Sequence, residues 1–234
     1  LTMADGKPLP AHIPKNIPPA WTDVEINPDQ KGSLLVKGRD EKGRVQSVYS
    51  DSHVTRQAEK KFARNRETIL KENEIRKQNS ANLKHKDPAI REAAAATVLL
   101  QEMGLRPGST RDTKAAKQAY GATTLEGRHV KLQSDGSVRL QFTGKKGVAL
   151  DILVDNPQAI KMLKDRASKA GASGRLFNTD DSQLRAYSKT LDGGGIKPKD
   201  FRTAKGTKTA IDAIKSMKSP ANEKEYKKHV REVA

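Results

Sequence analysis

The chain contains no cysteine and no long apolar run. Without cysteine it can form neither a disulfide framework nor a thiolate-ligated metal site. Its five histidines are widely scattered and show no HExxH-like spacing, so the sequence predicts no metal site. No apolar stretch reaches the roughly 18 residues that a membrane-spanning helix needs. Because no secretory signal peptide precedes the first predicted domain, we expect a cytoplasmic protein.

The charge balance is strongly basic. Lysine and arginine number 45 against 28 aspartates and glutamates, which gives a formal net charge of +17. Such an excess predicts attraction to a polyanion, most simply nucleic acid, with strong salt dependence. An anionic membrane surface ranks lower, because no basic amphipathic helix carries Trp, Phe or Leu on its opposite face. A merely solubilising basic surface is the remaining interpretation.

The first part of the chain predicts a small antiparallel sheet. Residues 1–20 are rich in proline and predict an extended segment. Stretches with β-branched and aromatic residues follow at 22–26, 33–40 and 44–50, and the separators "NPDQKG" and "DEKG" are typical of turns. A long helix comes next, with apolar residues near helical spacing and charges on its other face. The polar stretch 76–87 predicts a boundary between domains 1–78 and 79–234.

The second part predicts a mostly helical domain with its own sheet. Asp87 and Pro88 are an N-cap and a first-turn proline for a nearly all-apolar helix that stops at Gly104. Alternating apolar residues then predict a three-stranded meander. Its strands are residues 129–133, 137–142 and 147–153, and the helices expected after it are 157–170, 180–190, 198–217 and one starting near Asn222. The fold class is therefore α+β.

Three basic residues lie at the edges of these predicted elements. Arg106 follows a buried helix, Lys145 lies in a hairpin turn, and Arg202 lies near the start of a helix. Each alone is more often a solvated charge. Together, two guanidiniums and an ammonium would bind a phosphodiester, since arginine presents a planar fork to two phosphate oxygens. Fixed donors also stabilise charge that develops during attack at phosphorus, and lysine can protonate a leaving oxygen. The residues alone thus predict a phosphate clamp in a nucleic-acid-binding protein.

Several longer motifs carry a family resemblance. "IPPAWTDVEI" and "GRDEKGRVQSVYS" resemble the amino-terminal DNA-clamping domain of type IB DNA topoisomerases of the poxvirus and bacterial kind. "GLRPGS", "YGATTLEGRHVKL", "VRLQFTGKKGV" and "KDFRTAKGT" follow in that family's order. The resemblance covers about residues 13–210. It implies a β-rich amino-terminal domain and a mostly helical catalytic domain that close around double-stranded DNA.

The resemblance also implies an isomerase activity. A tyrosine breaks one strand through a 3′-phosphotyrosyl link, and the strand swivels and is religated by a monomer without ATP or metal. Arg106 matches the first catalytic arginine of the family, Arg202 the second, and Lys145 the lysine that acts as general acid, with Lys146 as its rival. Residues expected to contact DNA are Arg39, Lys42, Arg44, Tyr120, Lys146 and Lys205. A bacterial or phage member would associate with the nucleoid.

One part of the family pattern is missing. No segment resembling LGNTPxVxxxSYI, which carries the nucleophilic tyrosine, follows "KDFRT". We therefore expect a truncated topoisomerase that binds DNA but does not cleave it. Tyr226 is predicted to be a core residue and His229 an ordinary helix residue. Tyr49, Tyr120 and Tyr187 are likewise interpreted as packing residues.

Two other functions remain open. The first is a tyrosine recombinase-like protein. The stretch "MGLRPGS" would suit the first sequence motif of that family, although no HxLR-like second motif occurs. The second is a non-catalytic DNA-binding clamp module of a larger protein.

Overall fold

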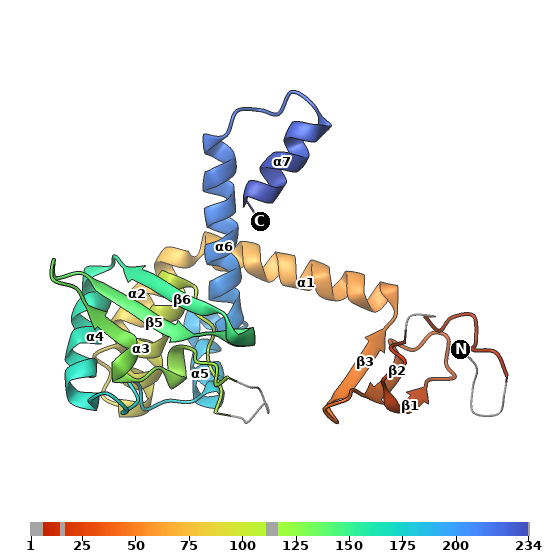
Figure 1. Cartoon of the computed structure of the whole chain (residues 1–234), viewed down its shortest axis with the longest axis horizontal. Helices are drawn as coiled ribbons and strands as arrows, with labels where there is room; N and C mark the ends of the chain where they lie inside the picture. Colours follow the sequence, from red (N-terminus) through yellow and green to blue (C-terminus); the bar gives the residue numbers. More distant parts are fainter. Residues whose placement is uncertain (1–6, 15–16, 111–116, 234) are drawn as a thin grey trace. The chain divides into compact units, whose positions relative to one another are not determined.

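The computed structural model describes residues 7–14, 17–110 and 117–233, and of Val233 the backbone alone. Contacts divide the chain into two compact units, Leu1–Ala63 and Arg64–Ala234. The division falls within α1 (Asp51–Leu70), one continuous helix in Figure 1. The domain limits inferred from the sequence, 1–78 and 79–234, stay a prediction. No helix among the described residues is long and apolar enough to cross a membrane.

The first unit contains the predicted antiparallel sheet. Its strands are β1 (Thr22–Ile26), β2 (Leu34–Arg39) and β3 (Val45–Tyr49), with β2 in the middle. Asp40 shapes the β2–β3 turn, because its carboxylate accepts the backbone N–H groups of Lys42 and Arg44. The buried residues of this unit form a small core against which Trp21 packs: Ile13, Ile17, Leu35 and Val36.

Helix α1 differs from its sequence pattern. The apolar side chains of Val54, Phe62 and Leu70 are exposed, whereas the buried side chains are Asn65 and Thr68. The physical reason is that hydrogen bonds offset much of the cost of burying these polar groups. The amide nitrogen of Asn65 donates to Thr207, and the hydroxyl of Thr68 donates back to the carbonyl of Arg64 within the helix, whereas Oδ1 of Asn65 has no hydrogen-bond partner among the described residues.

The second unit is built around one central helix, α3 (Pro88–Met103). The carboxylate of Asp87 accepts the N–H of Ala89, and Gly104 ends the helix in the left-handed conformation with φ 62°. These predicted ends are confirmed. The other helices of the unit are α2 (Glu72–Asn82), α4 (Pro157–Ala170), α5 (Asp181–Ser188), α6 (Pro198–Ser216) and α7 (Glu223–Val233). Short 3₁₀ turns are η1 (Ala122–Thr124), η2 (Gly127–His129), η3 (Lys145–Gly147) and η4 (Leu191–Gly193).

A second antiparallel sheet packs into the same core. Its strands are β4 (Val130–Leu132), β5 (Val138–Thr143) and β6 (Ala149–Val154), with β5 in the middle (Figure 1). Val138, Leu140 and Phe142 share one face of β5, as their alternation predicts, and join the core formed with α3. The predicted α+β class, with a sheet in each part, is confirmed.

Helix α7 corrects one expectation about tyrosine. Tyr226 was predicted to be a core residue, but 58% of it is exposed, and Val230 is also exposed. Lysine, glutamate and arginine make up most of this helix. Its few apolar side chains are too sparse to exclude water, so burial does not stabilise it.

Candidate active site

Arg106 follows Gly104 and Leu105 on a tightly held loop. Its carbonyl accepts the N–H of Ala122 at 2.8 Å, and Gly108 has φ 95°, a conformation that favours glycine. The loop passes so close to Gly121 that a Cβ there would lie 2.6 Å from the Arg106 oxygen. The side chain of Arg106 is exposed while its backbone is fixed on both sides.

Arg202 approaches this loop from the first turns of α6. Its Nη1 donates to the carbonyl oxygen of Gly104 at 2.8 Å, so its guanidinium lies against the turn that carries Arg106. Burial, and then repulsion from the Arg106 guanidinium, lower the pKa of Arg202. An arginine stays protonated despite such a shift. The two positive charges are therefore near enough to repel one another, and a bound anion would relieve that repulsion.

Lys145 lies in the η3 turn between β5 and β6. The turn is closed by the N–H of Gly144 donating to Val148 at 2.7 Å, and Lys146 adopts a left-handed conformation with φ 65°. Both lysine side chains are exposed. Directly before this turn, the carbonyl of Thr143 at the end of β5 accepts the N–H of Tyr120 at 2.8 Å. Tyr120 directly precedes the glycine that packs on the Arg106 loop, so one short segment joins the hairpin to that loop.

A basic cavity opens beside Pro107. Its volume is about 520 Å³. Four cations and one carboxylate line it together with three apolar residues: Arg185, Lys189, Lys197, Lys199, Asp181, Pro107, Ile196 and Pro198. Asp181 is paired with Arg185 at 2.6 Å. No sequence motif pointed to Arg185 or Lys189, because Arg185 lies in an ordinary amphipathic helix, α5, and Lys189 is the residue that caps its end.

Tyr120 and Lys205, both expected to contact DNA, lie close to the same loop. The Tyr120 ring packs on His129 with centroids 4.3 Å apart, and its hydroxyl accepts from Arg128 at 2.9 Å. Burial lowers the pKa of His129, which favours its neutral form at pH 7. Lys205 lies on α6, and a Cβ at Gly104 would meet its Cγ at 3.5 Å.

The expected DNA contacts of the first unit surround the β2–β3 turn. Arg39 pairs with Asp23 at 3.2 Å, and Arg44 pairs with Asp40 at 2.6 Å. The hydrogen bond from Arg44 is the main reason that the pKa of Asp40 is lowered. Lys42 is exposed at the tip. Exposed ion pairs contribute little net stability, so these arginines can exchange a carboxylate for a phosphate at small cost.

Tyr187 has surroundings that oppose nucleophilic attack. Its hydroxyl donates to Asn79 at 2.6 Å and accepts from Asn82 at 3.0 Å inside the core. Burial raises the pKa of Tyr187 to about 12. A phenol that is buried, bonded on both sides and hard to ionise is a packing residue, as the sequence predicts.

Comparison with known proteins identifies the family. The model of the eukaryotic DNA topoisomerase I catalytic core matches residues 50–234. The chain belongs to the type IB DNA topoisomerase family. It is 29% identical over 233 residues to DNA topoisomerase 1B of Acanthamoeba polyphaga mimivirus, an alignment that spans 92% of this chain and 68% of the viral protein. It is 27% identical over 132 residues to DNA topoisomerase 1 of Daucus carota, spanning 56% of this chain and 16% of the plant protein.

Proposed function

We propose that this chain is the DNA-binding and phosphate-clamping part of a type IB topoisomerase, which breaks and rejoins one strand of duplex DNA to relax supercoils. The observation that carries the proposal is the pairing of Arg202 with the Arg106 turn. Arg202 is anchored on the carbonyl of Gly104, close enough to Arg106 for repulsion to lower its pKa. Such a pair of guanidiniums would bind a tetrahedral or pentavalent phosphate more strongly than it would bind a neutral ligand.

The proposed roles follow from the donors. Arg106 and Arg202 hold the non-bridging oxygens of the scissile phosphate, where negative charge builds up as the nucleophile attacks. Lys145 gives a proton to the departing 5′-oxygen. Lys146 is its rival for this role, since both side chains are exposed on the same turn.

The surrounding basic residues extend the proposed contact with DNA. Lys189 and Lys197 of the cavity lie next to the Arg106 loop, where they can neutralise phosphates adjacent to the scissile one. Tyr120, Lys146 and Lys205 belong to the same unit. The first unit would contribute Arg39, Lys42 and Arg44, whose contacts with the backbone of the duplex are independent of base sequence.

We propose further that residues 1–234 bind DNA without cleaving it. Tyr187 is buried and bonded through its hydroxyl, and Tyr120 is held by Arg128. Tyr49 stacks on His53 in the first unit at 4.7 Å. Tyr226 is exposed on α7, and it is the alternative nucleophile. A non-catalytic DNA clamp remains the second candidate function, supported by the same observations.

The test combines binding with strand transfer. Residues 1–234 should bind a duplex in fluorescence anisotropy, with log K falling linearly against log salt concentration. They should leave supercoiled plasmid unrelaxed, whereas a native form that extends further and supplies a tyrosine should relax it without magnesium or ATP. An affinity flat in salt would contradict the DNA-binding proposal. Relaxation by residues 1–234 that is abolished by Tyr226→Phe would contradict the proposed absence of a nucleophile.

A further inference from the structure

The two clamp arginines belong to separate elements that must be held together against repulsion. Arg106 lies on the turn after α3, and Arg202 lies on α6. The bond from Arg202 to Gly104 joins these elements directly. A second set of contacts comes from residues 64–76, which form the end of α1 and the start of α2. We call this segment the brace.

The brace first contacts the start of α6. The Nε of Arg64 donates to Oδ2 of Asp200 at 2.7 Å, and only 5% of the Asp200 side chain is exposed. The same oxygen accepts the backbone N–H of Lys197 at 3.0 Å, which caps the helix. Asp200 lies two residues before Arg202. Arg64 therefore supplies the counter-charge for the nearly buried carboxylate that fixes the first turn of α6.

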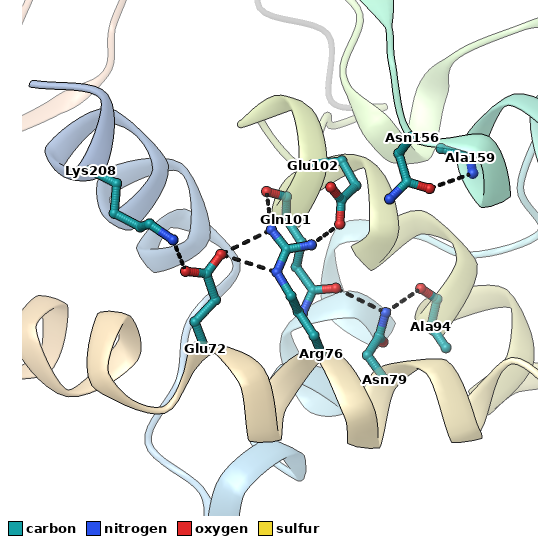
Figure 2. Close-up of polar contacts among 9 residues, drawn as sticks. All are labelled: Glu72, Arg76, Asn79, Ala94, Gln101, Glu102, Asn156, Ala159 and Lys208. Carbon is teal, nitrogen blue, oxygen red and sulfur yellow. Dashed lines mark hydrogen bonds and ion pairs between the residues drawn. The ribbon is translucent and has the colours of Figure 1, made fainter. Parts of the chain in front are cut away.

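Further along, the brace contacts both elements at once. Asn65 donates to Thr207 at 3.0 Å. Figure 2 shows the Glu72 carboxylate between the Lys208 ammonium of α6 and the Arg76 guanidinium, which also reaches Glu102 in the last turn of α3. Burial opposes ionisation of Glu72, but the hydrogen bonds from Lys208 and Arg76 outweigh it and lower its pKa.

We propose that Arg64 and Arg76 are positioning residues of the phosphate clamp. Through Asp200, and through Glu72 and Glu102, they hold α6 and the end of α3 in the register that directs Arg202 and Arg106 onto one phosphate. They also occupy the carboxylates next to the clamp, which leaves its two arginines available for the anion. Catalytic constellations need this support, because displacements of about 1 Å are costly. The inference rests on the proposed function.

The experiment follows the clamp arginines themselves. In ¹⁵N-labelled residues 1–234, the Nε–Hε signals of Arg106 and Arg202 are assigned by their loss in Arg106→Lys and Arg202→Lys. Inorganic phosphate is then added. In the wild type both signals should move with one common affinity. Arg64→Ala should weaken the phosphate response of Arg202, and Arg76→Ala that of Arg106, each by about tenfold, and the two signals should no longer titrate together.

A matched control separates positioning from general stability. Arg166→Ala removes the ion pair between Arg166 and Glu92. The Arg166 side chain is about as exposed as that of Arg64, but its ion pair joins α4 to the first half of α3. It should lower the melting temperature while leaving the phosphate affinity of both arginines unchanged. Equal weakening in Arg166→Ala and Arg64→Ala, or wild-type affinity in both brace variants, would overturn the inference.

A gentler pair of variants covers the case in which Arg64→Ala does not fold. Asp200→Asn keeps the shape of the carboxylate and an oxygen for the helix cap, and Arg64→Gln removes the charge but keeps a hydrogen-bond donor on a shorter side chain. If the pair acts as one unit, the double variant should weaken phosphate binding no more than either single variant, whereas additive weakening would count against the brace. Wild-type protein in which phosphate moves neither arginine signal would refute the proposed phosphate clamp, and the brace with it. Wild-type binding with insensitive brace variants would refute the brace alone.

Discussion

The two units place their cations in different ways. Around the β2–β3 turn of the first unit, Arg39 and Arg44 are held by exposed pairs with nearby carboxylates. In the second unit, Arg202 is anchored on a backbone carbonyl, and its helix is tied through nearly buried Asp200 to Arg64. Loose cations suit sequence-independent contact with a flexible polyanion, whereas braced cations suit a single reacting phosphate. The difference teaches that net charge governs how tightly such a chain binds DNA, whereas fixed geometry governs whether its cations can act on a single reacting phosphate.

The largest expected effect tests the braced cations. Arg106→Ala or Arg202→Ala in a cleavage-competent native form should slow formation of the covalent DNA adduct by about 10²–10³-fold, because each removes a donor that acts on developing charge. DNA affinity at moderate salt should change little, since many other basic residues contribute to it. Single-turnover gels measure the rate, and anisotropy measures the affinity. Equal losses in rate and affinity would erase the distinction between the two kinds of cation.

The next effect concerns the cores on which these cations rest. Leu99→Ala in the fully buried centre of α3 should destabilise the second unit by roughly 2–5 kcal/mol, since it opens a cavity in a close-packed interior. Leu35→Ala in the smaller first core should cost less, because this site has more freedom to collapse. Chemical denaturation of both variants gives the comparison. A larger loss for Leu35→Ala would show that the first unit is as tightly packed as the second.

A smaller effect tests the loose cations. Arg39→Ala and Arg44→Ala should each reduce the slope of log K against log salt concentration by about 0.9, the value for one phosphate contact. Lys169→Ala, an exposed lysine at the end of α4 and outside all the expected contacts, serves as the control and should leave the slope unchanged. If all the variants have the same slope, the β2–β3 turn is not part of the DNA-binding surface.

The smallest effect is a pH dependence in the brace. The pKa of Glu72 is lowered in the folded protein, so its stabilising contribution is fully present above the ordinary value of 4.5 and is lost as pH falls through the folded value. Glu72→Gln should therefore destabilise the protein at pH 7 and converge with the wild type in acid. Melting curves across this range measure the difference. A constant gap between the two proteins would show that ionisation of Glu72 does not contribute.

Local patterns predicted much of this fold from sequence. Asp87, Pro88 and Gly104 delimit α3 because a cap, a first-turn proline and a left-handed glycine act within a few residues of one another. The alternation in β5 likewise predicted its buried face. The roles of Arg106, Lys145 and Arg202 stay predictions, drawn from their positions at element ends and from the resemblance.

The brace could not be predicted in the same way. Arg64 and Asp200 are far apart in sequence, and neither lies in a pattern that specifies the other as its partner. The exposure of Tyr226 escaped prediction for a related reason. Helical spacing identifies which residues share a face, but it does not say whether another element covers that face.

Trp21 gives the first unit an optical signal of its own. It is the sole tryptophan of the chain, and it packs beside β2, where a Cβ on Gly38 would lie 2.9 Å from its ring. Emission excited at the red edge of indole absorption therefore arises from the first unit alone. Unfolding of the first unit, and its response to DNA, can thus be followed by itself without an attached dye.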